Sequence, residues 1–364
     1  MCGEGRRGSR LADGRIRVAL DALGGDDGPE MVVKGSVRAL RQTPDLDLIL
    51  VGDQTRLEAM VAHQRGVDPG RLRIIHADGV VRNEDKPAVA LRQGGESSMR
   101  KAIDLVRDGQ ADCVVSAGNT GALMAMSKIS LRMLKGISRP AMVTRLPTRS
   151  GECCMLDLGA NVECDAENLI QFALMGAIFA TVVGGVAHPH VGLLNVGSEE
   201  QKGHDELREA AAALRQLSGG YFTFHGFVEG DDIARGTVDV VVTDGFTGNI
   251  ALKTAEGTAR MLFGSMRAAI KSSFFGRLGF LLSHVALRQV RQRFDPRSHN
   301  GAVFVGLNGI SVKSHGGTDM IGFANAIGVA TELVRRDFLV QVRERVEGLR
   351  PIAGDDGGGA ADYA

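Results

Sequence analysis

Five glycine-rich polar turns contain the residues of this sequence that are best suited to chemistry. They span residues 21–26, 116–121, 157–161, 195–203 and 244–249. Each turn combines glycine, which lets the backbone approach a ligand closely, with a short polar side chain where a helix should begin. The free N–H groups and the dipole of a helix start favour an anion. One such turn can be an ordinary cap, but five of them predict a polar cleft for a small oxyanion.

The elements around these turns alternate between strands and helices. Short apolar runs predict strands at 17–21, 48–51, 72–75, 113–115, 141–146, 153–158, 191–196 and 238–243. These runs are continuous rather than alternating, which is typical of strands that are buried on both faces. We therefore expect a three-layer α/β/α fold with a mostly parallel sheet, whose carboxyl-terminal edge would bring the five turns together.

The division of the chain follows from its length and composition. The 364 residues are enough for one large α/β domain, which we predict over 16–350. Residues 1–15 are basic and glycine-rich without the apolar core of a signal peptide, and 351–364 are rich in Gly, Ala and Asp, so both segments are expected to be disordered. No stretch reaches the ~20 apolar residues that span a bilayer, so we expect a soluble protein. The cysteines lack paired spacing and are expected to be reduced thiols, which predicts a cytoplasmic location.

Several classes of function lack their signatures in this sequence. The glycines that follow the first predicted strand, at 24–28, are not spaced as GxGxxG, and no GxxxxGK[ST] or GxSxG motif is present, which argues against a dehydrogenase, a kinase and an α/β-hydrolase. The five cysteines show no paired spacing, and His188 and His190 are wrongly spaced for one helical face. We therefore predict no metal and no cofactor. The formal net charge is zero, so no nucleic-acid partner is expected.

A set of motifs in a fixed order makes the sequence resemble one family. The motifs are DALGGD at 21–26, EDKPAVALRQGGESSMRKAI at 84–103, SAGNTGALM at 116–124, LDLGANVEC at 156–164, NVGSEEQKG at 195–203, DGFTGN at 244–249 and GLNGISVKSHG at 306–316. Together they resemble the signature blocks of the acyl-ACP:phosphate acyltransferases, the PlsX family, over residues 16–346. The family's usual DAMGGD reads DALGGD here, an exchange of similar volume.

This resemblance implies a fold similar to phosphotransacetylases and isocitrate-dehydrogenase-like enzymes, usually as a homodimer. It implies that fatty acyl-ACP and inorganic phosphate are converted to acyl phosphate and ACP. The product would supply a downstream glycerol-3-phosphate acyltransferase in phospholipid synthesis. A CoA-dependent phosphotransacetylase on the same fold and a non-catalytic membrane-associated scaffold remain alternatives. The residues do not show which carrier is used, although the clustered polar turns argue against the scaffold.

Phosphate that attacks a thioester is its own nucleophile, so the site needs an anion cradle, donors to the oxyanion and a route for the thiol. For that reaction, the predicted phosphate-binding residues are Ser97, Ser98, Gly118, Asn119, Thr120 and Gly121. The predicted catalytic residues are Lys202 beside the phosphate or oxyanion, Asn161 and Asn249 as oxyanion donors, and His315, which would protonate the sulfur. Asp21, Asp157 and Asp244 are predicted to orient these partners. Lys202 could also be an ordinary solvated lysine at a helix start.

Residues 257–294 contain seven basic and no acidic side chains and predict a projecting amphipathic helical hairpin. Its apolar tip includes Phe274, Phe275, Leu278 and Leu281. One interpretation is an ordinary helix pair that packs on the core or on a dimer partner. The interpretation that we favour is a tip that dips into an anionic membrane surface, with basic flanks that meet headgroups or the acidic carrier. We therefore expect peripheral association with the inner face of the cell membrane.

Overall fold

The computed structural model describes residues 14–149, 151–295 and 297–348. The segments 1–13 and 349–364, which contain almost all of the predicted extension and the whole predicted tail, lie outside the described residues. Within them, the strands are β1 (Ile16–Asp21), β2 (Leu46–Gly52), β3 (Leu72–His76), β4 (Cys113–Ser116), β5 (Ala141–Pro147), β6 (Glu152–Leu156), β7 (His190–Leu194), β8 (Thr223–Val228), β9 (Val240–Val242), β10 (Ala302–Val305) and β11 (Ile310–Lys313). The helices are α1 (Gly28–Gln42), α2 (Gln54–Ala62), α3 (Pro87–Gln93), α4 (Ser98–Arg107), α5 (Thr120–Leu131), α6 (Ala166–Val182), α7 (Asp205–Leu217), α8 (Gly230–Arg235), α9 (Gly245–Ser272), α10 (Phe274–Arg293), α11 (Met320–Arg335) and α12 (Phe338–Gly348).

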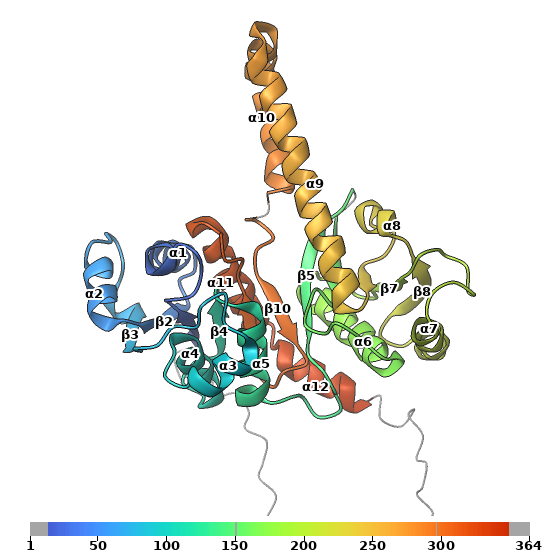
Figure 1. Cartoon of the computed structure of the whole chain (residues 1–364), viewed down its shortest axis with the longest axis horizontal. Coiled ribbons are helices and arrows are strands. Elements are labelled where there is room, and N and C mark those ends of the chain that lie inside the picture. Colours follow the sequence, from blue (N-terminus) through green and yellow to red (C-terminus); the bar gives the residue numbers. More distant parts are fainter. Residues whose placement is uncertain (1–13, 150, 296, 349–364) are drawn as a thin grey trace, which may run out of the picture.

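The strands form one eleven-stranded sheet that crosses the body of the molecule from β3 to β8 (Figure 1). Its order is β3-β2-β1-β4-β11-β10-β5-β6-β9-β7-β8. The first five strands are mutually parallel, and so are the last four. Between them, β10 and β5 are each antiparallel to both neighbours. The prediction of a mostly parallel α/β sheet is therefore confirmed.

The central strands also correct one expectation. Three successive antiparallel pairings, from β11 through β10 and β5 to β6, make the two parallel groups run in opposite directions. The carboxyl ends of β1 and β4 therefore do not share an edge with those of β6, β9 and β7. The prediction that all five glycine-rich turns lie at one edge of the sheet was wrong.

Helices cover both faces of the sheet, and the core lies in two apolar layers. Successive strand residues point to opposite faces, so Val18 and Leu20 belong to one buried cluster whereas Ala19 belongs to the other. The strands at the centre are buried on both sides, as their continuous apolar runs predict. This rigid sheet fixes where each turn beyond a strand is placed.

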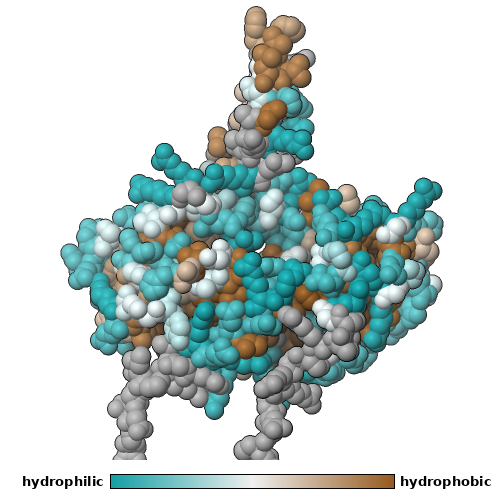
Figure 2. All heavy atoms as spheres, turned by 180° about the vertical axis from the view of Figure 1, so that it is seen from behind, coloured by the Kyte–Doolittle hydropathy of each residue, from teal (hydrophilic) through white to brown (hydrophobic). Residues whose placement is uncertain are grey.

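Helices α9 and α10 project together from the body as a long hairpin (Figure 1). They meet at Ser273, which has extended backbone, and the predicted tip residues Phe274 and Phe275 are 76% and 80% exposed. Figure 2 shows hydrophobic residues gathered at the end of this projection. The prediction of a projecting hairpin is confirmed, although α9 begins at Gly245, twelve residues before the predicted start. Among the described helices, none is long and apolar enough to cross a bilayer.

Candidate functional site

Three polar side chains lie in a row across the ends of three neighbouring parallel strands. In register, Asp21 at the end of β1 is opposite Ser116 at the end of β4, and Ser116 is opposite Lys313 at the end of β11. All three are buried. Residues opposite one another in a sheet point to the same face, so this row is where the turns after β1, β4 and β11 converge.

The Asp21 carboxylate ties these elements together. Its Oδ1 accepts a hydrogen bond from Ser98 Oγ at 2.6 Å, and its Oδ2 accepts one from Ser116 Oγ at 2.7 Å. The backbone N–H groups of Leu23 and Gly24 also donate to it. Burial raises the pKa of Asp21 above its ordinary value, and these hydrogen bonds oppose that rise. Asp21 thus positions both the start of α4 and the end of β4.

The turns after β1, β4 and β11 pack backbone against backbone. A Cβ on Gly24 would lie 2.5 Å from Asp21 Oδ2 and 2.7 Å from the amide nitrogen of Gly118, so only glycine fits there. The N–H of Asp26 donates to the carbonyl of Gly316 at 3.0 Å. This close contact fixes the three turns relative to one another.

Most of the predicted phosphate-binding side chains already have protein partners. Ser97 caps α4 by accepting from the amide of Arg100 and donates to the carbonyl of Gly94. Asn119 caps α5 by accepting from the amide of Ala122. Its Nδ2 also donates to three backbone carbonyls, those of Arg82, Asn83 and Asp85, at 3.3, 2.9 and 3.0 Å. These side chains therefore build the cradle rather than offer it free donors.

The free donors of the cradle are backbone amides. At the start of α5, within the described part of the chain, the N–H groups of Thr120 and Gly121 have no acceptor, as expected for the first turn of a helix. A Cβ on Gly121 would lie 2.8 Å from Pro87 Cγ, so the segment before α3 packs closely against this turn. The start of α5 is a ready site for an anion.

Lys313 is a buried lysine that the sequence analysis did not identify. Its Nζ donates to the carbonyl of Ala117 at 3.2 Å and to the carbonyl of Ser314. Burial lowers the pKa of Lys313 to about 8, against the opposing effect of Asp21 and Asp26, and Lys253 lowers it further. The ammonium thus contacts the carbonyl of Ala117, which lies in the turn just before the free amides at the start of α5.

His315 follows Lys313 by two residues, and its side chain is exposed. Its Nδ1 accepts a hydrogen bond from the N–H of Gly317 at 3.1 Å, and its backbone N–H donates to Asn300 Oδ1 at 2.9 Å. The loss of water around the ring lowers the pKa of His315, and so do Lys253 and Lys313. The neutral ring carries its proton on Nε2, because Nδ1 is occupied as an acceptor. His315 can thus donate from Nε2 to a reacting oxygen or sulfur.

Helix α9 connects the second group of strands to this site. Asp244 caps α9 by accepting from Thr247 N at 2.8 Å and Thr247 Oγ1 at 2.7 Å. Further along the same helix, Lys253 and Glu256 are close enough to shift the pKa of His315 in opposite directions. The base of the projecting hairpin is therefore close enough to His315 for its charges to act on that ring.

The remaining predicted residues gather at the ends of β6 and β9. Asp157 is fully buried and accepts hydrogen bonds from Met142 N at 2.9 Å, Asn161 N at 2.7 Å and Asn161 Nδ2 at 2.8 Å. Asn161 Nδ2 also donates to the carbonyl of Pro140 at 2.7 Å, so both of its amide hydrogens are used. Asn249 lies beside Gly159 and is exposed. An oxyanion role for Asn161 and Asn249 stays a prediction.

Lys202 lies beyond β7, in the group of strands that runs opposite to β1, β4 and β11. It is exposed, and its Nζ forms an ion pair with Glu199 Oε2 at 2.8 Å. That hydrogen bond raises the pKa of Lys202. No contact joins Lys202 to Asp21, Ser116 or Lys313 among the described residues, and its catalytic role stays a prediction.

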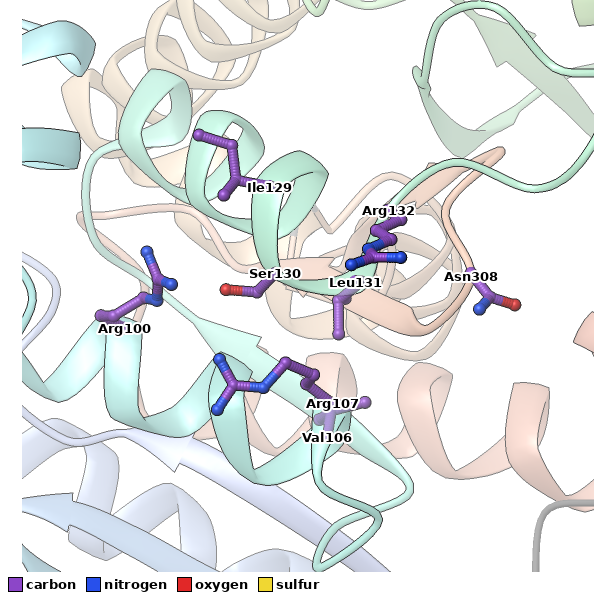
Figure 3. A pocket seen from close by; sticks show the side chains of 8 residues that line it. All are labelled: Arg100, Val106, Arg107, Ile129, Ser130, Leu131, Arg132 and Asn308. Carbon is purple, nitrogen blue, oxygen red and sulfur yellow. The ribbon is translucent and has the colours of Figure 1, made fainter. Parts of the chain in front are cut away.

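A cavity of about 410 Å³ lies away from this row, at the opposite end of β11 (Figure 3). Arg100, Arg107 and Arg132 surround it, together with Ser130 and Asn308. Arg100 and Arg107 are both paired with Asp104. Because the carboxyl ends of the strands do not reach this cavity, we do not assign the reaction to it.

Metal or cysteine chemistry has no support in the described parts of the chain. No group of His, Cys, Asp or Glu side chains there could hold a metal ion. Cys113, Cys153 and Cys154 are buried free thiols, and burial raises the pKa of Cys153 to about 12. Such thiols are inert as nucleophiles.

Solved structures with this fold include phosphotransacetylases. A phosphotransacetylase from Streptococcus pyogenes is 18% identical with a TM-score of 0.62, covering 88% of this chain and 94% of its own. The EutD phosphotransacetylase from Staphylococcus aureus is 17% identical with a TM-score of 0.59, covering 90% and 96%. At these identities the likeness concerns the fold alone. It confirms the fold class that the sequence predicts.

Curated relatives share a much larger fraction of identical residues with this chain than these solved structures do. The family model described as "Fatty acid synthesis protein" matches residues 16–341. A phosphate acyltransferase of Rhodospirillum centenum is 54% identical over 336 residues, covering 92% of this chain and 94% of the relative. That of Caulobacter vibrioides is 50% identical over 336 residues, covering 92% and 93%. The chain therefore belongs to the phosphate acyltransferase family, and it is an acyltransferase.

Proposed function

We propose that this enzyme transfers a fatty acyl group from acyl-ACP to inorganic phosphate, at the site formed by the turns after β1, β4 and β11. The observation that carries this proposal is a cradle of free amides at Thr120 and Gly121 beside the buried Lys313. Its donors suit an anion, and none of its side chains is an activated nucleophile. This is what a reaction needs when the phosphate itself attacks.

The proposed reaction has one bond made and one bond broken. A phosphate oxygen attacks the thioester carbonyl, the C–S bond breaks, and the products are the acyl phosphate and the thiol of ACP. The role proposed for His315 is to donate a hydrogen bond from Nε2 to the departing sulfur, because the ring is neutral and exposed at the edge of the cradle. The proton that the thiol gains is the one that the attacking hydrogen phosphate loses. Asp21, Ser98 and Asn119 hold the cradle in place. Oriented substrates and fixed donors account for most of such a rate.

The wider role follows from the product. Acyl phosphate made here would supply the enzyme that acylates glycerol-3-phosphate in phospholipid synthesis, and a homodimer fits the family. We further propose peripheral membrane association through the hairpin tip. The exposed tip residues Phe274, Phe275, Leu278 and Leu281 lie at the end of a projection whose described basic side chains include Arg260 and Arg267. An apolar tip with basic flanks is typical of a segment that binds anionic headgroups.

Incubation of the purified enzyme with a long-chain acyl-ACP and labelled phosphate tests this function directly. We expect labelled acyl phosphate and free ACP in equal amounts. A parallel reaction with the corresponding acyl-CoA decides between carriers: faster label transfer from CoA would favour a CoA-dependent transacylase. No labelled product from either donor would exclude catalysis of this reaction and support a scaffold.

A further inference from the structure

Lys313 carries a buried charge that forms no direct ion pair with a carboxylate in the described part of the chain. It is only 9% exposed, and Asp21 and Asp26 act on its Nζ through their charge without a hydrogen bond to it. Asp21, the acidic residue of the row, already accepts hydrogen bonds from Ser98, Ser116 and two backbone amides. The two acceptors of the ammonium are neutral carbonyls, those of Ala117 and Ser314. One of its three hydrogens is therefore left for another partner.

A buried ammonium without a direct ion pair is costly, because the water that it has lost is not replaced by a hydrogen-bonded carboxylate. Buried lysines in proteins are therefore normally paired. Two other lysines show the usual arrangement: Lys202 pairs with Glu199, and Lys253 pairs with Glu256 at 2.9 Å. Lys313 differs from both in being buried and in having no such partner among the described residues.

The position of Lys313 identifies the missing partner as an anion of small size. The carbonyl of Ala117, which it contacts, lies in the turn that leads into α5, whose first amides are free. We propose that Lys313, rather than Lys202, is the cation that binds the phosphate substrate. This inference rests on the proposed function, because it assigns the charge in the same cradle. Phosphate would fill the third hydrogen-bonding position of the ammonium and the free amides together.

Phosphate affinity should depend on pH through the proton of Lys313. Binding of a dianion would hold the proton on Lys313, so phosphate affinity should fall as Lys313 loses its proton above about pH 8. The charged groups that act on Lys313 are Asp21 on β1, Asp26 in the turn before α1 and Lys253 on α9. Of these, Lys253 is exposed whereas Lys313 is buried beside the cradle, so we assign the change in this range to Lys313.

The test measures phosphate binding by the rise in melting temperature that phosphate produces, at pH 7 and pH 9.5, with chloride at equal ionic strength as the blank. Wild type should show a clear rise at pH 7 and a much smaller one at pH 9.5. Lys313→Met should bind phosphate about 10- to 100-fold more weakly, the range expected for a lost charge-assisted hydrogen bond. Lys34→Met, on the outer face of α1 and paired with Glu30, is the matched control and should behave as wild type.

Lys313→Arg keeps a charge that does not titrate, and it covers the case in which the Met variant folds poorly. Its phosphate response should not fall between pH 7 and pH 9.5. Wild-type phosphate affinity in Lys313→Met, or the same fall with pH in Lys313→Arg as in wild type, would overturn the inference. The acyl-transfer assay separates this from failure of the proposed function: an active wild-type enzyme with an unaffected Met variant removes only the role of Lys313.

Discussion

The side chain of Asn300 holds the backbone of His315 in place. Asn300 Oδ1 accepts the N–H of His315 at 2.9 Å, while its Nδ2 donates to Ser314 Oγ and to the carbonyl of Gly322, both at 2.8 Å. Asn300 is buried and precedes β10, just after the hairpin returns to the body. One side chain thus joins the end of the hairpin, the His315 turn and the start of α11.

Replacing Asn300 by Ala should lower both stability and kcat. The variant removes the acceptor of the His315 amide and the donor to the buried Ser314 Oγ, and an unsatisfied buried group costs about 1–3 kcal/mol. It also releases the His315 turn, so kcat should fall more than the affinity for phosphate. Calorimetric unfolding and steady-state kinetics measure the two effects.

Asn168 offers a matched control for this variant. It is buried on α6, and its Nδ2 donates to Ser138 Oγ at 2.9 Å, far from the site. Asn168→Ala should lower the melting temperature while kcat stays at the wild-type value. A wild-type kcat in Asn300→Ala would show that the position of His315 does not depend on this contact.

Replacing Asn119 by Asp should abolish turnover. The side-chain Nδ2 of Asn119 donates to the carbonyls of Arg82, Asn83 and Asp85. A carboxylate has no N–H to donate, so it would repel these three carbonyl oxygens. The segment 82–87 should then separate from α5 and exchange its amide hydrogens faster. Hydrogen exchange and the acyl-transfer assay together measure this.

The two readouts distinguish two causes of the loss. Lost turnover with unchanged exchange at 82–87 would point to direct repulsion between the new carboxylate and the phosphate. Full turnover in a folded Asn119→Asp protein would mean that the cradle is not at the start of α5.

The elements could be predicted from the sequence because their signals are local. The apolar run of β4 and the charge pattern of the hairpin are continuous stretches, and each lies where it was expected. The direction of the second group of strands could not be predicted. It depends on β10, from near the end of the chain, pairing with β5, more than 150 residues earlier. No local pattern specifies that partner.

The site could be predicted only in part, because local motifs identify some of its residues but not the contacts between distant segments. Asp21 and Ser98 lie in distinctive motifs, and the structure brings them into contact. Lys313 ends an apolar strand, and nothing in its neighbours shows that its Nζ is buried whereas that of Lys202 is exposed. Asn300 lies outside every motif, and only the folded chain shows what it contacts.

Changing Phe275 and Leu278 together to Glu should abolish binding to anionic vesicles. Both side chains are exposed on the projecting hairpin, so the variant should fold normally and keep its activity in solution. Wild-type binding should weaken as salt is raised, because basic side chains near the tip are attracted to headgroups through screened charge. Co-sedimentation with vesicles of anionic or zwitterionic lipid measures this.

Ile129→Glu is the matched control for the hairpin variant. Ile129 is 56% exposed on α5, outside the hairpin, so its replacement adds a charge to an apolar surface position elsewhere. This variant should bind vesicles as wild type does. Equal binding by the hairpin variant and wild type would mean that the tip packs against another protein surface, such as a dimer partner.

The stability of the phosphate-free enzyme should depend on pH through Lys313. Burial lowers the pKa of Lys313 from 10.5 to about 8 in the folded state. Below pH 8 both folded and unfolded chains hold the proton, and the folded state bears the full cost of the buried charge. Between pH 8 and 10.5 only the unfolded chain holds the proton, so this residue's contribution to the free energy of unfolding rises with pH, by about 3 kcal/mol in total.

Lys313→Met lacks that contribution, so urea unfolding of both proteins at pH 7.5 and pH 10 should show that the stability of the variant relative to wild type falls at the higher pH. Parallel pH dependence in the two proteins would mean that Lys313 titrates in the folded enzyme as an ordinary solvated lysine.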